Sequence, residues 1–77
     1  MRHKAINVKI LDRYVLVIEF NNGEIKEFDV KPYLDLRAFK KIKEDYNEFK
    51  KVKIDGLSIA WECGIDICTD ELYNNGK

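Results

Sequence analysis

Residues 14–30 read YVLVIEFNNGEIKEFDV, and the other elements are expected to pack on this segment or extend it. Two apolar-rich segments flank Asn22-Gly23, a dipeptide that favours a two-residue hairpin turn because both residues tolerate positive φ. A turn at this position pairs Val17 with Phe28, and directly opposed side chains share one face of a sheet. The pattern therefore predicts an antiparallel hairpin whose core face carries Val15, Val17, Phe28 and Val30.

The residues before the hairpin alternate between apolar and polar over positions 5–11. A second two-residue turn at Asp12-Arg13 would pair Ile10 with Val15, which predicts a three-stranded antiparallel meander with the second strand in the centre. The core face then gains Ile6, Val8 and Ile10. The opposite face carries Leu11, Tyr14, Leu16, Ile18, Phe20 and Ile25. Because a solvated face should be polar, we expect a later element or a partner to cover it.

The segment that follows, residues 31–51, predicts helical structure. Pro32 suits the start of a short 3₁₀ turn, after which Leu34 and Leu36 would anchor to the core and Asp35 would cap the next element. Apolar residues then recur at helical steps in Phe39, Ile42, Tyr46 and Phe49. A break at residues 45–47 would divide this segment into two short helices. We expect the segment to cover the core face of the meander.

A second hairpin is predicted over residues 52–61, with its turn at Asp55-Gly56. One face of it would carry Val52, Ile54, Leu57, Ile59 and Trp61. Residues 65–67 alternate and predict a short extended segment, and Thr69 would cap a C-terminal helical turn. The fold class is thus a single α+β domain over residues 1–77, in which the meander and second hairpin pack against one or two short central helices.

Composition excludes several protein classes. The chain has 77 residues, 45% hydrophobic and 36% charged, which is typical of a folded soluble domain and not of a disordered one. The sequence contains no apolar run of the ~20 residues that a membrane span requires. The basic start is not followed by the apolar stretch of a signal peptide. We therefore expect a cytoplasmic protein with no membrane contact, and with Cys63 and Cys68 as reduced thiols.

Charge is unevenly distributed although the formal net charge is zero. Residues 37–53 hold seven basic and three acidic side chains, whereas residues 54–77 hold one basic and five acidic. Such an asymmetry can steer a partner, although the favoured interpretation is a solvated helix beside a solvated tail.

The residue types that carry chemistry are sparse. His3 is the single histidine, near an end of the chain that we expect to fray, and it has no visible helper. Cys63 and Cys68 are more widely spaced than a zinc-binding cysteine pair. The sequence contains no phosphate-binding loop or nucleophile motif. We predict no catalytic residue, no metal and no cofactor.

An ordered set of motifs spans nearly the whole chain. Its members are Phe20, Asn22-Gly23, Asp29-Val30, Phe39, Phe49, Val52, Ile54, Trp61, Gly64, Asp66-Ile67 and Leu72-Tyr73. In this set the chain resembles the small bacterial proteins of domain-of-unknown-function family 2442. It departs from the family pattern at Glu62-Cys63 and near Thr69, where prolines are usual. The resemblance implies a small α+β fold with no established activity, and a gene arrangement similar to a toxin–antitoxin pair.

The first functional hypothesis is that the protein is a non-enzymatic protein-binding module. One form of this hypothesis is that it is the antitoxin-like half of a two-gene pair. Its partner would be another small protein or a second copy. The residues expected at the contact are Leu16, Ile18, Phe20, Trp61 and Asp66.

Two alternatives belong to other classes. A nucleic-acid-associated transcriptional regulator would use the lysine-rich segment 40–53 through Lys40, Lys41, Lys43, Lys50, Lys51 and Lys53. It is less favoured because the sequence pI is about 6.6. A small hydrolase built on the carboxylates of Asp66 and Asp70 is the third hypothesis.

Overall fold

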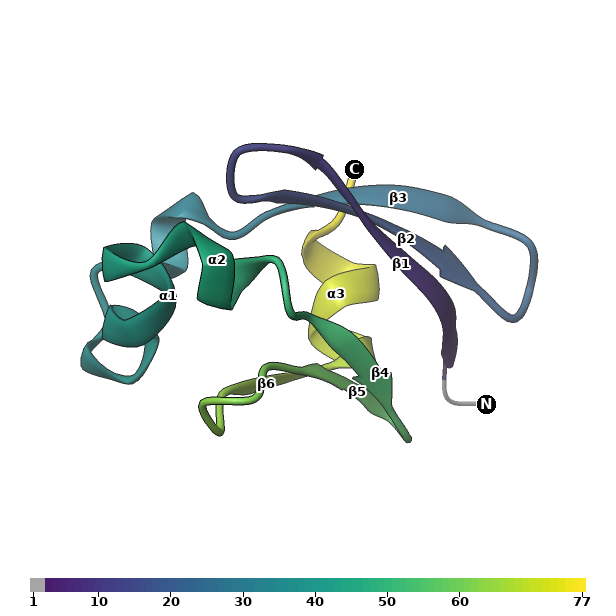
Figure 1. Cartoon of the computed structure of the whole chain (residues 1–77). Helices are drawn as coiled ribbons and strands as arrows, with labels where there is room; N and C mark the ends of the chain where they lie inside the picture. The colour runs from purple at the N-terminus through teal and green to yellow at the C-terminus, as the bar shows by residue number, and fades with distance from the viewer. Residues whose placement is uncertain (1–2) are drawn as a thin grey trace.

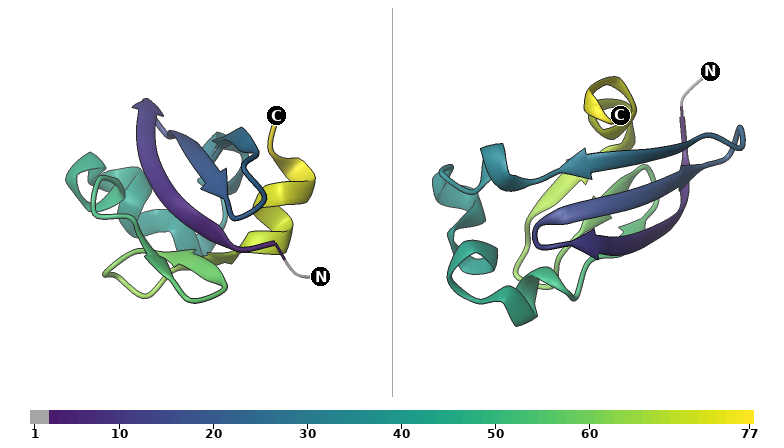
Figure 2. Two further views of the ribbon diagram at one scale, coloured as in Figure 1. Left: turned by 90° about the vertical axis from the view of Figure 1, so that its right-hand side faces the viewer. Right: turned by 90° about the horizontal axis from the view of Figure 1, so that it is seen from above.

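Two small antiparallel sheets face each other in the computed structural model, which describes residues 3–77 (Figure 1). The C-terminal helix contacts a strand of each sheet, and the short central helices lie at one end of the pair (Figure 2). This α+β architecture agrees with the predicted fold class. In chain order the elements are β1 (Ala5–Asp12), β2 (Val15–Phe20), β3 (Ile25–Asp29), η1 (Lys31–Tyr33), η2 (Arg37–Phe39), α1 (Lys40–Glu44), α2 (Tyr46–Phe49), β4 (Lys53–Asp55), β5 (Ser58–Ala60), β6 (Asp66–Cys68) and α3 (Thr69–Asn75).

The first sheet is the predicted meander, with strand order β1-β2-β3, but its register differs from the prediction by one residue. The Phe20 N–H donates to the Glu24 carbonyl at 2.8 Å, so the β2–β3 loop has three residues. Gly23 has φ +89°, whereas Asn22 has no positive φ. This is a type I turn followed by a left-handed glycine, the usual three-residue hairpin loop. Phe28 therefore lies opposite Leu16 and not opposite Val17.

This one-residue shift reverses the two faces of β2. Leu16, Ile18 and Phe20 are completely buried, and Val15 and Val17 lie on the outside of the sheet. The predicted core face was therefore wrong for β2, because a one-residue shift moves every side chain of a strand to the other face. The prediction that Phe28 and Val30 are core residues is confirmed.

The register of β1 against β2 shifts at two points, one on each side of the pairs that join Val8 to Ile18 and Ile10 to Leu16. Val8 and Ile10 pack on the core, as predicted. The residues at the two irregularities are Ile6 and Leu11, and each is 53% exposed. The prediction that Ile6 joins the core was therefore wrong, and Ala5 is buried in its place.

The turn between β1 and β2 is Arg13-Tyr14, one residue later than predicted. Tyr14 has φ +59°, which is uncommon for a residue with a side chain. Its ring is buried, and its hydroxyl donates to the carbonyls of Ile42 at 2.9 Å and Lys43 at 3.1 Å. These contacts tie the turn to α1 and offset the backbone strain.

The predicted break in the helical segment is confirmed. Asp45 ends α1, and its carboxylate accepts a hydrogen bond from the Asn47 N–H at 3.0 Å at the start of α2. The apolar stripe faces inward through Phe39, Ile42 and Phe49, with Tyr46 half-buried. The segment lies at one end of the sheets (Figure 1), so the expectation that it covers the core face of the meander was wrong.

The short turn at η1 is confirmed, and Leu34 packs against the core. Leu36 is 53% exposed, so it does not anchor the segment. Asp35 does not cap η2, which has Leu36 at that position. The Asp35 carboxylate instead accepts from the Lys43 ammonium at 3.3 Å.

The second sheet contains the predicted hairpin and one strand more. Ile54 lies opposite Ile59, and β6 adds to β5 as a third strand. The turn is Gly56-Leu57, with Gly56 at φ +60°. Leu57 is consequently a turn residue and 40% exposed, so its predicted place on the inner face was wrong. The buried Trp61 indole N–H donates to the Phe49 carbonyl at 2.9 Å.

Thr69 is the first residue of α3, and Cys68 occupies the cap position predicted for it. The buried Thr69 hydroxyl donates to the His3 carbonyl at 2.6 Å instead. The His3 ring stacks on Tyr73 with 3.5 Å between ring centroids. His3 is therefore held in place, against the expectation of a frayed end.

Candidate functional site

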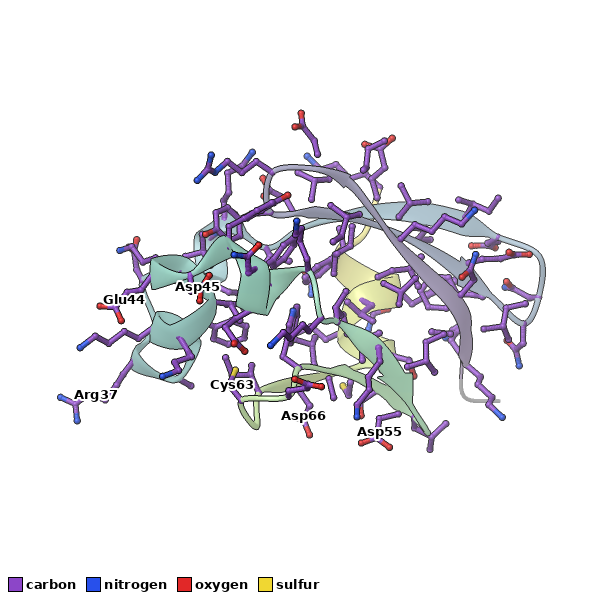
Figure 3. The ribbon with its side chains drawn as sticks, in the orientation of Figure 1. Arg37, Glu44, Asp45, Asp55, Cys63 and Asp66 are labelled. Carbon is purple, nitrogen blue, oxygen red and sulfur yellow. The ribbon has the colours of Figure 1, made fainter. Side chains whose placement is uncertain are left out.

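The residues predicted for partner binding lie mainly in the core. Leu16, Ile18 and Phe20 are fully buried, and Trp61 is 2% exposed. Asp66 is exposed, on the side of the second sheet that faces away from the meander (Figure 3). In the folded chain the four apolar side chains therefore hold the fold and are not accessible to a partner.

The six predicted nucleic-acid-binding lysines are all exposed. Half of them form surface ion pairs, namely Lys40 with Glu44, Lys43 with Asp35, and Lys51 with both Glu48 and Glu62. The hydrogen bond and the charge of Glu48 raise the pKa of Lys51. These contacts neutralise part of the basic segment, although such exposed pairs are weak.

The carboxylates proposed for a hydrolase lie on β6 and in the first turn of α3. Asp66 is exposed and Asp70 is half-buried. Across residues 3–77, no group of three or more His, Cys, Asp or Glu side chains is placed to hold a metal ion. Cys63 and Cys68 are exposed free thiols.

The outward face of the meander, called here the outer face, carries accessible apolar side chains. Val17 lies between Lys9 and Glu27, Glu19 lies beside Ile25, and Val15 lies beside Asp29. Ile25 is 64% exposed, and the bulge residues Ile6 and Leu11 add two more exposed aliphatic side chains at the β1 margin. A solvent-facing sheet surface is normally polar, so this composition departs from the usual pattern.

The charges on the outer face are mostly negative. Lys9 is its basic residue, and the acidic ones are Asp12, Glu19, Glu27 and Asp29. Lys31 lies 3.9 Å from the Asp29 carboxylate at the rim and neutralises it in part. The outer face therefore combines aliphatic side chains with a negative field.

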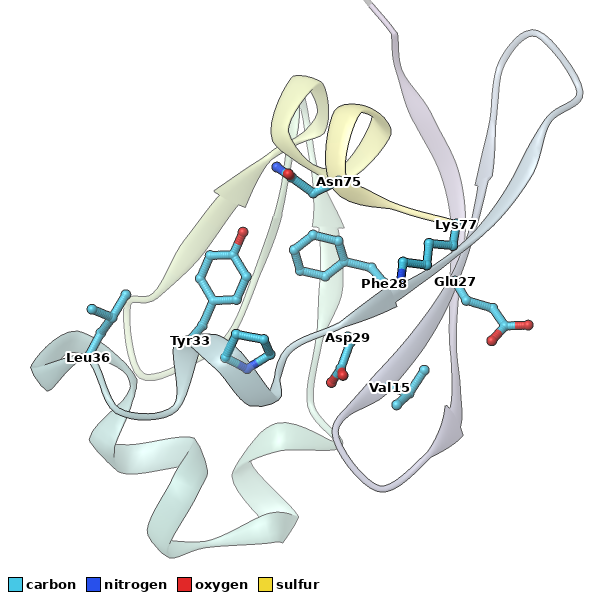
Figure 4. Close-up of a pocket in the computed structure, with 9 residues that line it drawn as sticks. Val15, Glu27, Phe28, Asp29, Tyr33, Leu36, Asn75 and Lys77 are labelled. Atoms are coloured by element: carbon cyan, nitrogen blue, oxygen red, sulfur yellow. The ribbon is translucent and has the colours of Figure 1, made fainter.

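A groove of about 610 Å³ lies beside β3, between η1 and the C-terminal end of α3 with Lys77 (Figure 4). We call it the β3 groove. Its lining is Val15, Glu27, Phe28, Asp29, Pro32, Tyr33, Leu36, Asn75 and Lys77. The Tyr33 hydroxyl donates to the Glu71 carboxylate at 2.9 Å. Burial, followed by this hydrogen bond and the charge of Glu71, raises the pKa of Tyr33.

The open edge of β3 borders the same groove. The Val30 N–H donates to the Tyr14 carbonyl, and the Phe20 N–H donates to the Glu24 carbonyl. The even-numbered residues of β3 therefore turn their backbone N–H and carbonyl groups toward β2. Ile25, Glu27 and Asp29 consequently turn theirs to the open edge. The Lys77 N–H donates to the Glu27 carbonyl at 2.8 Å, which places an extended residue against this edge.

Sequence reasoning missed the outer face, although a signal for it was present. Glu19 is in phase with Val15 and Val17, whereas Phe20 is in phase with Leu16 and Ile18. The predicted core face of β2 therefore carried a carboxylate, and the other face did not. The β3 groove had no such signal, because its walls come from distant segments.

None of the helices between residues 3 and 77 has the length and apolar character needed to cross a membrane. No curated protein and no solved structure matches the chain. The sequence model of a family described as "Protein of unknown function (DUF2442)" matches residues 5–77, which is nearly the whole chain. The match agrees with the resemblance seen in the ordered motifs, and the chain belongs to the DUF2442 family.

Proposed function

We propose that this protein is a non-enzymatic protein-binding module, and that it binds through the outer face of the meander. The observation that carries the proposal is the exposure of aliphatic side chains there, led by Ile25 at 64%. Two irregularities in β1 leave Ile6 and Leu11 exposed as well, although each could have been polar at no cost to the core. Apolar patches rimmed by charge are typical of protein-binding surfaces.

The charge of the outer face defines the chemistry of the partner. Glu19 and Glu27 flank the aliphatic residues, so a complementary surface presents apolar side chains beside lysine or arginine. Complementary charge raises the association rate and excludes partners of the wrong sign. Nucleic acid carries the same sign as this face, which favours a protein partner.

A finer form of the proposal follows from the resemblance of the chain to its family. The partner would be the product of a neighbouring gene, with this protein as the antitoxin-like half of the pair. Co-expression of this protein with the neighbouring gene tests this form. If this protein is antitoxin-like, it should relieve the growth defect that the neighbouring gene causes when it is expressed alone. Growth that is unaffected by the neighbour would contradict the finer form and leave the binding proposal in place.

The binding proposal is tested by purification of the tagged chain from its native host, with light scattering to give the mass of the complex. We expect a stoichiometric protein partner that is lost in Val17→Lys and in Ile25→Ser. Leu57→Ser is the matched control, because Leu57 is an exposed aliphatic residue in the turn of the other sheet. A partner retained by Ile25→Ser and Val17→Lys, or a chain that stays alone, would contradict the proposal.

The same purification distinguishes nucleic-acid binding from protein binding. Contacts to phosphate weaken steeply with salt, so retention of RNA or DNA at low salt that depends on Lys41, Lys50 and Lys53 would move the function to the basic segment. Loss of binding in the outer-face variants alone supports the proposed function.

A further inference from the structure

The open edge of β3 offers backbone hydrogen-bonding groups to an extended chain. The N–H groups of Glu27 and Asp29 point away from β2, and no backbone bond to either is found among residues 3–77. The Glu27 carbonyl already accepts a bond from Lys77, whose neighbour Gly76 has extended φ and ψ of −74° and 158°. An extended backbone therefore fits against this edge.

The β3 groove supplies space for side chains beside that edge. Its volume of about 610 Å³ falls in the range of about 300–1,000 Å³ that ligand-binding clefts occupy. Pro32 and Leu36 give it apolar walls, and the Tyr33 ring also lines it (Figure 4). In a strand, alternate side chains point to opposite faces, so every second residue of an added strand would enter the groove.

Charge distinguishes between the occupants of this edge. A second copy that pairs its own β3 antiparallel in the full-overlap register would oppose Glu27 to Glu27. If the register of the two β3 strands shifts by two residues in one direction, Glu27 of one copy lies opposite Asp29 of the other. If it shifts by two residues in the other direction, the two Lys26 residues lie opposite each other. Like charges directly opposite each other destabilise a strand pair. The acidic residues at positions 27 and 29 instead match a strand with lysine or arginine at alternate positions.

We propose that β3 binds an extended segment of a protein partner by strand addition, and that this segment alternates basic residues with apolar ones. The basic side chains lie opposite Glu27 and Asp29, and the apolar ones contact Pro32, Tyr33 and Leu36 in the β3 groove. The segment displaces Lys77 from the Glu27 carbonyl. Main-chain hydrogen bonds provide affinity and the groove provides specificity, as in other strand-addition sites. This inference rests on the proposed function and assigns the recognition element of the partner.

The test uses a phage-displayed random peptide library panned against the full chain. Selected peptides are expected to alternate lysine or arginine with apolar residues. Glu27→Pro removes the outward N–H and leaves the β2 ladder intact, because edge strands tolerate proline there. We expect it to weaken peptide binding by about tenfold or more, and Glu27→Gln, which keeps the N–H, to weaken it by about threefold.

Lys77 provides an independent control. Lys77→Pro removes the N–H that occupies the Glu27 carbonyl, so peptide affinity should rise about twofold or more over that of Lys77→Ala, which keeps this N–H. If Glu27→Pro does not fold, amide hydrogen exchange measured on the natural chain serves as the test in place of this variant. The amides of Glu27 and Asp29 should become protected when peptide binds, whereas those of Lys26 and Phe28, already bonded to β2, should not change.

Three results would overturn the inference. They are failure to select peptides, selection of peptides without the alternation, and unchanged exchange at Glu27 and Asp29 with a selected peptide bound. A host partner that is lost in Val17→Lys but kept in Glu27→Pro would overturn strand addition alone. That result would leave the proposed function standing.

Discussion

The two hairpins of this protein begin from similar turn signals and depart from prediction in different ways. Around Asn22-Gly23 the loop has three residues, so the pairing moves by one residue and β2 presents its other face. In the second hairpin the loop keeps two residues but begins at Gly56, so the pairing moves by two and both faces are preserved. Loop length, more than loop position, therefore decides which side chains reach the core.

The first hairpin tolerates this reversal because β2 is apolar at five of its six positions. Either face of it can pack on a core, whereas β3 is charged at three of its five positions. The structure buries Leu16, Ile18 and Phe20 and leaves Val15, Val17 and Glu19 outside. The larger apolar set is buried, and the carboxylate remains in solvent.

The strongest test of this comparison shortens one side chain on each face of β2. Ile18→Ala is expected to destabilise the protein by about 2–5 kcal/mol, because Ile18 is fully buried and its removal leaves a cavity. Val17→Ala should cost less than about 1 kcal/mol. Urea unfolding measures both. If Ile18→Ala does not fold, Ile18→Val replaces it, at about 0.5–1.5 kcal/mol. Equal losses at both positions would contradict the assignment of the faces.

The loop lengths can be tested at Asn22 and Gly23. Gly23→Ala should cost about 1–2 kcal/mol, because Gly23 has positive φ. Asn22→Gly should cost about 1 kcal/mol, since it removes the 3.0 Å hydrogen bond from the Glu24 N–H to the Asn22 side chain and loosens the unfolded chain. A two-residue turn would instead accept glycine at position 22. Neutral or stabilising behaviour of Asn22→Gly in thermal unfolding would therefore contradict the three-residue loop.

The second hairpin should show the same contrast at smaller scale. Ile59→Val is expected to cost about 0.5–1.5 kcal/mol, because Ile59 is fully buried opposite Ile54. Leu57→Ala should change stability by no more than about 0.5 kcal/mol, since Leu57 lies in the turn. Denaturant unfolding of the two variants measures the difference. A larger loss for Leu57→Ala would place the turn at Asp55-Gly56 after all.

The smallest expected effect is a pH dependence at the loop end of the first hairpin. The hydrogen bond that the Tyr73 hydroxyl donates to the Glu24 carboxylate is the main cause that raises the pKa of Tyr73, followed by burial and the charge of Glu24. A raised pKa in the folded state stabilises the protein fully below the ordinary value near 10, and this stabilisation is lost as pH rises through the raised pKa.

Unfolding measured between about pH 9 and pH 12 should show this loss in the natural chain and a smaller one in Tyr73→Phe. Tyr33, whose pKa is also raised, contributes with the same sign and is removed separately by Tyr33→Phe. An identical loss in Tyr73→Phe and in the natural chain would show that Glu24 and Tyr73 are not coupled.

The features that depend on neighbours along the chain were predictable from the amino-acid sequence. These are the three strands of the meander, the central place of β2, the break at Asp45, and the core role of residues such as Phe28 and Phe49. Each of these follows from alternation, helical spacing or a capping preference, which act within a few residues. The family also followed from the order of motifs in the sequence.

Tertiary packing decided which face of β2 is buried, the addition of β6 to the second sheet, and the hydrogen bond from Thr69 to His3. It also decided the β3 groove, and the hydrogen bond from its lining residue Tyr33 to Glu71, 38 positions away in sequence. The physical reason is that these outcomes depend on volume and hydrogen-bond partners supplied by distant segments. A strand that is apolar on both faces is oriented by the rest of the core, and its own pattern does not distinguish the two faces.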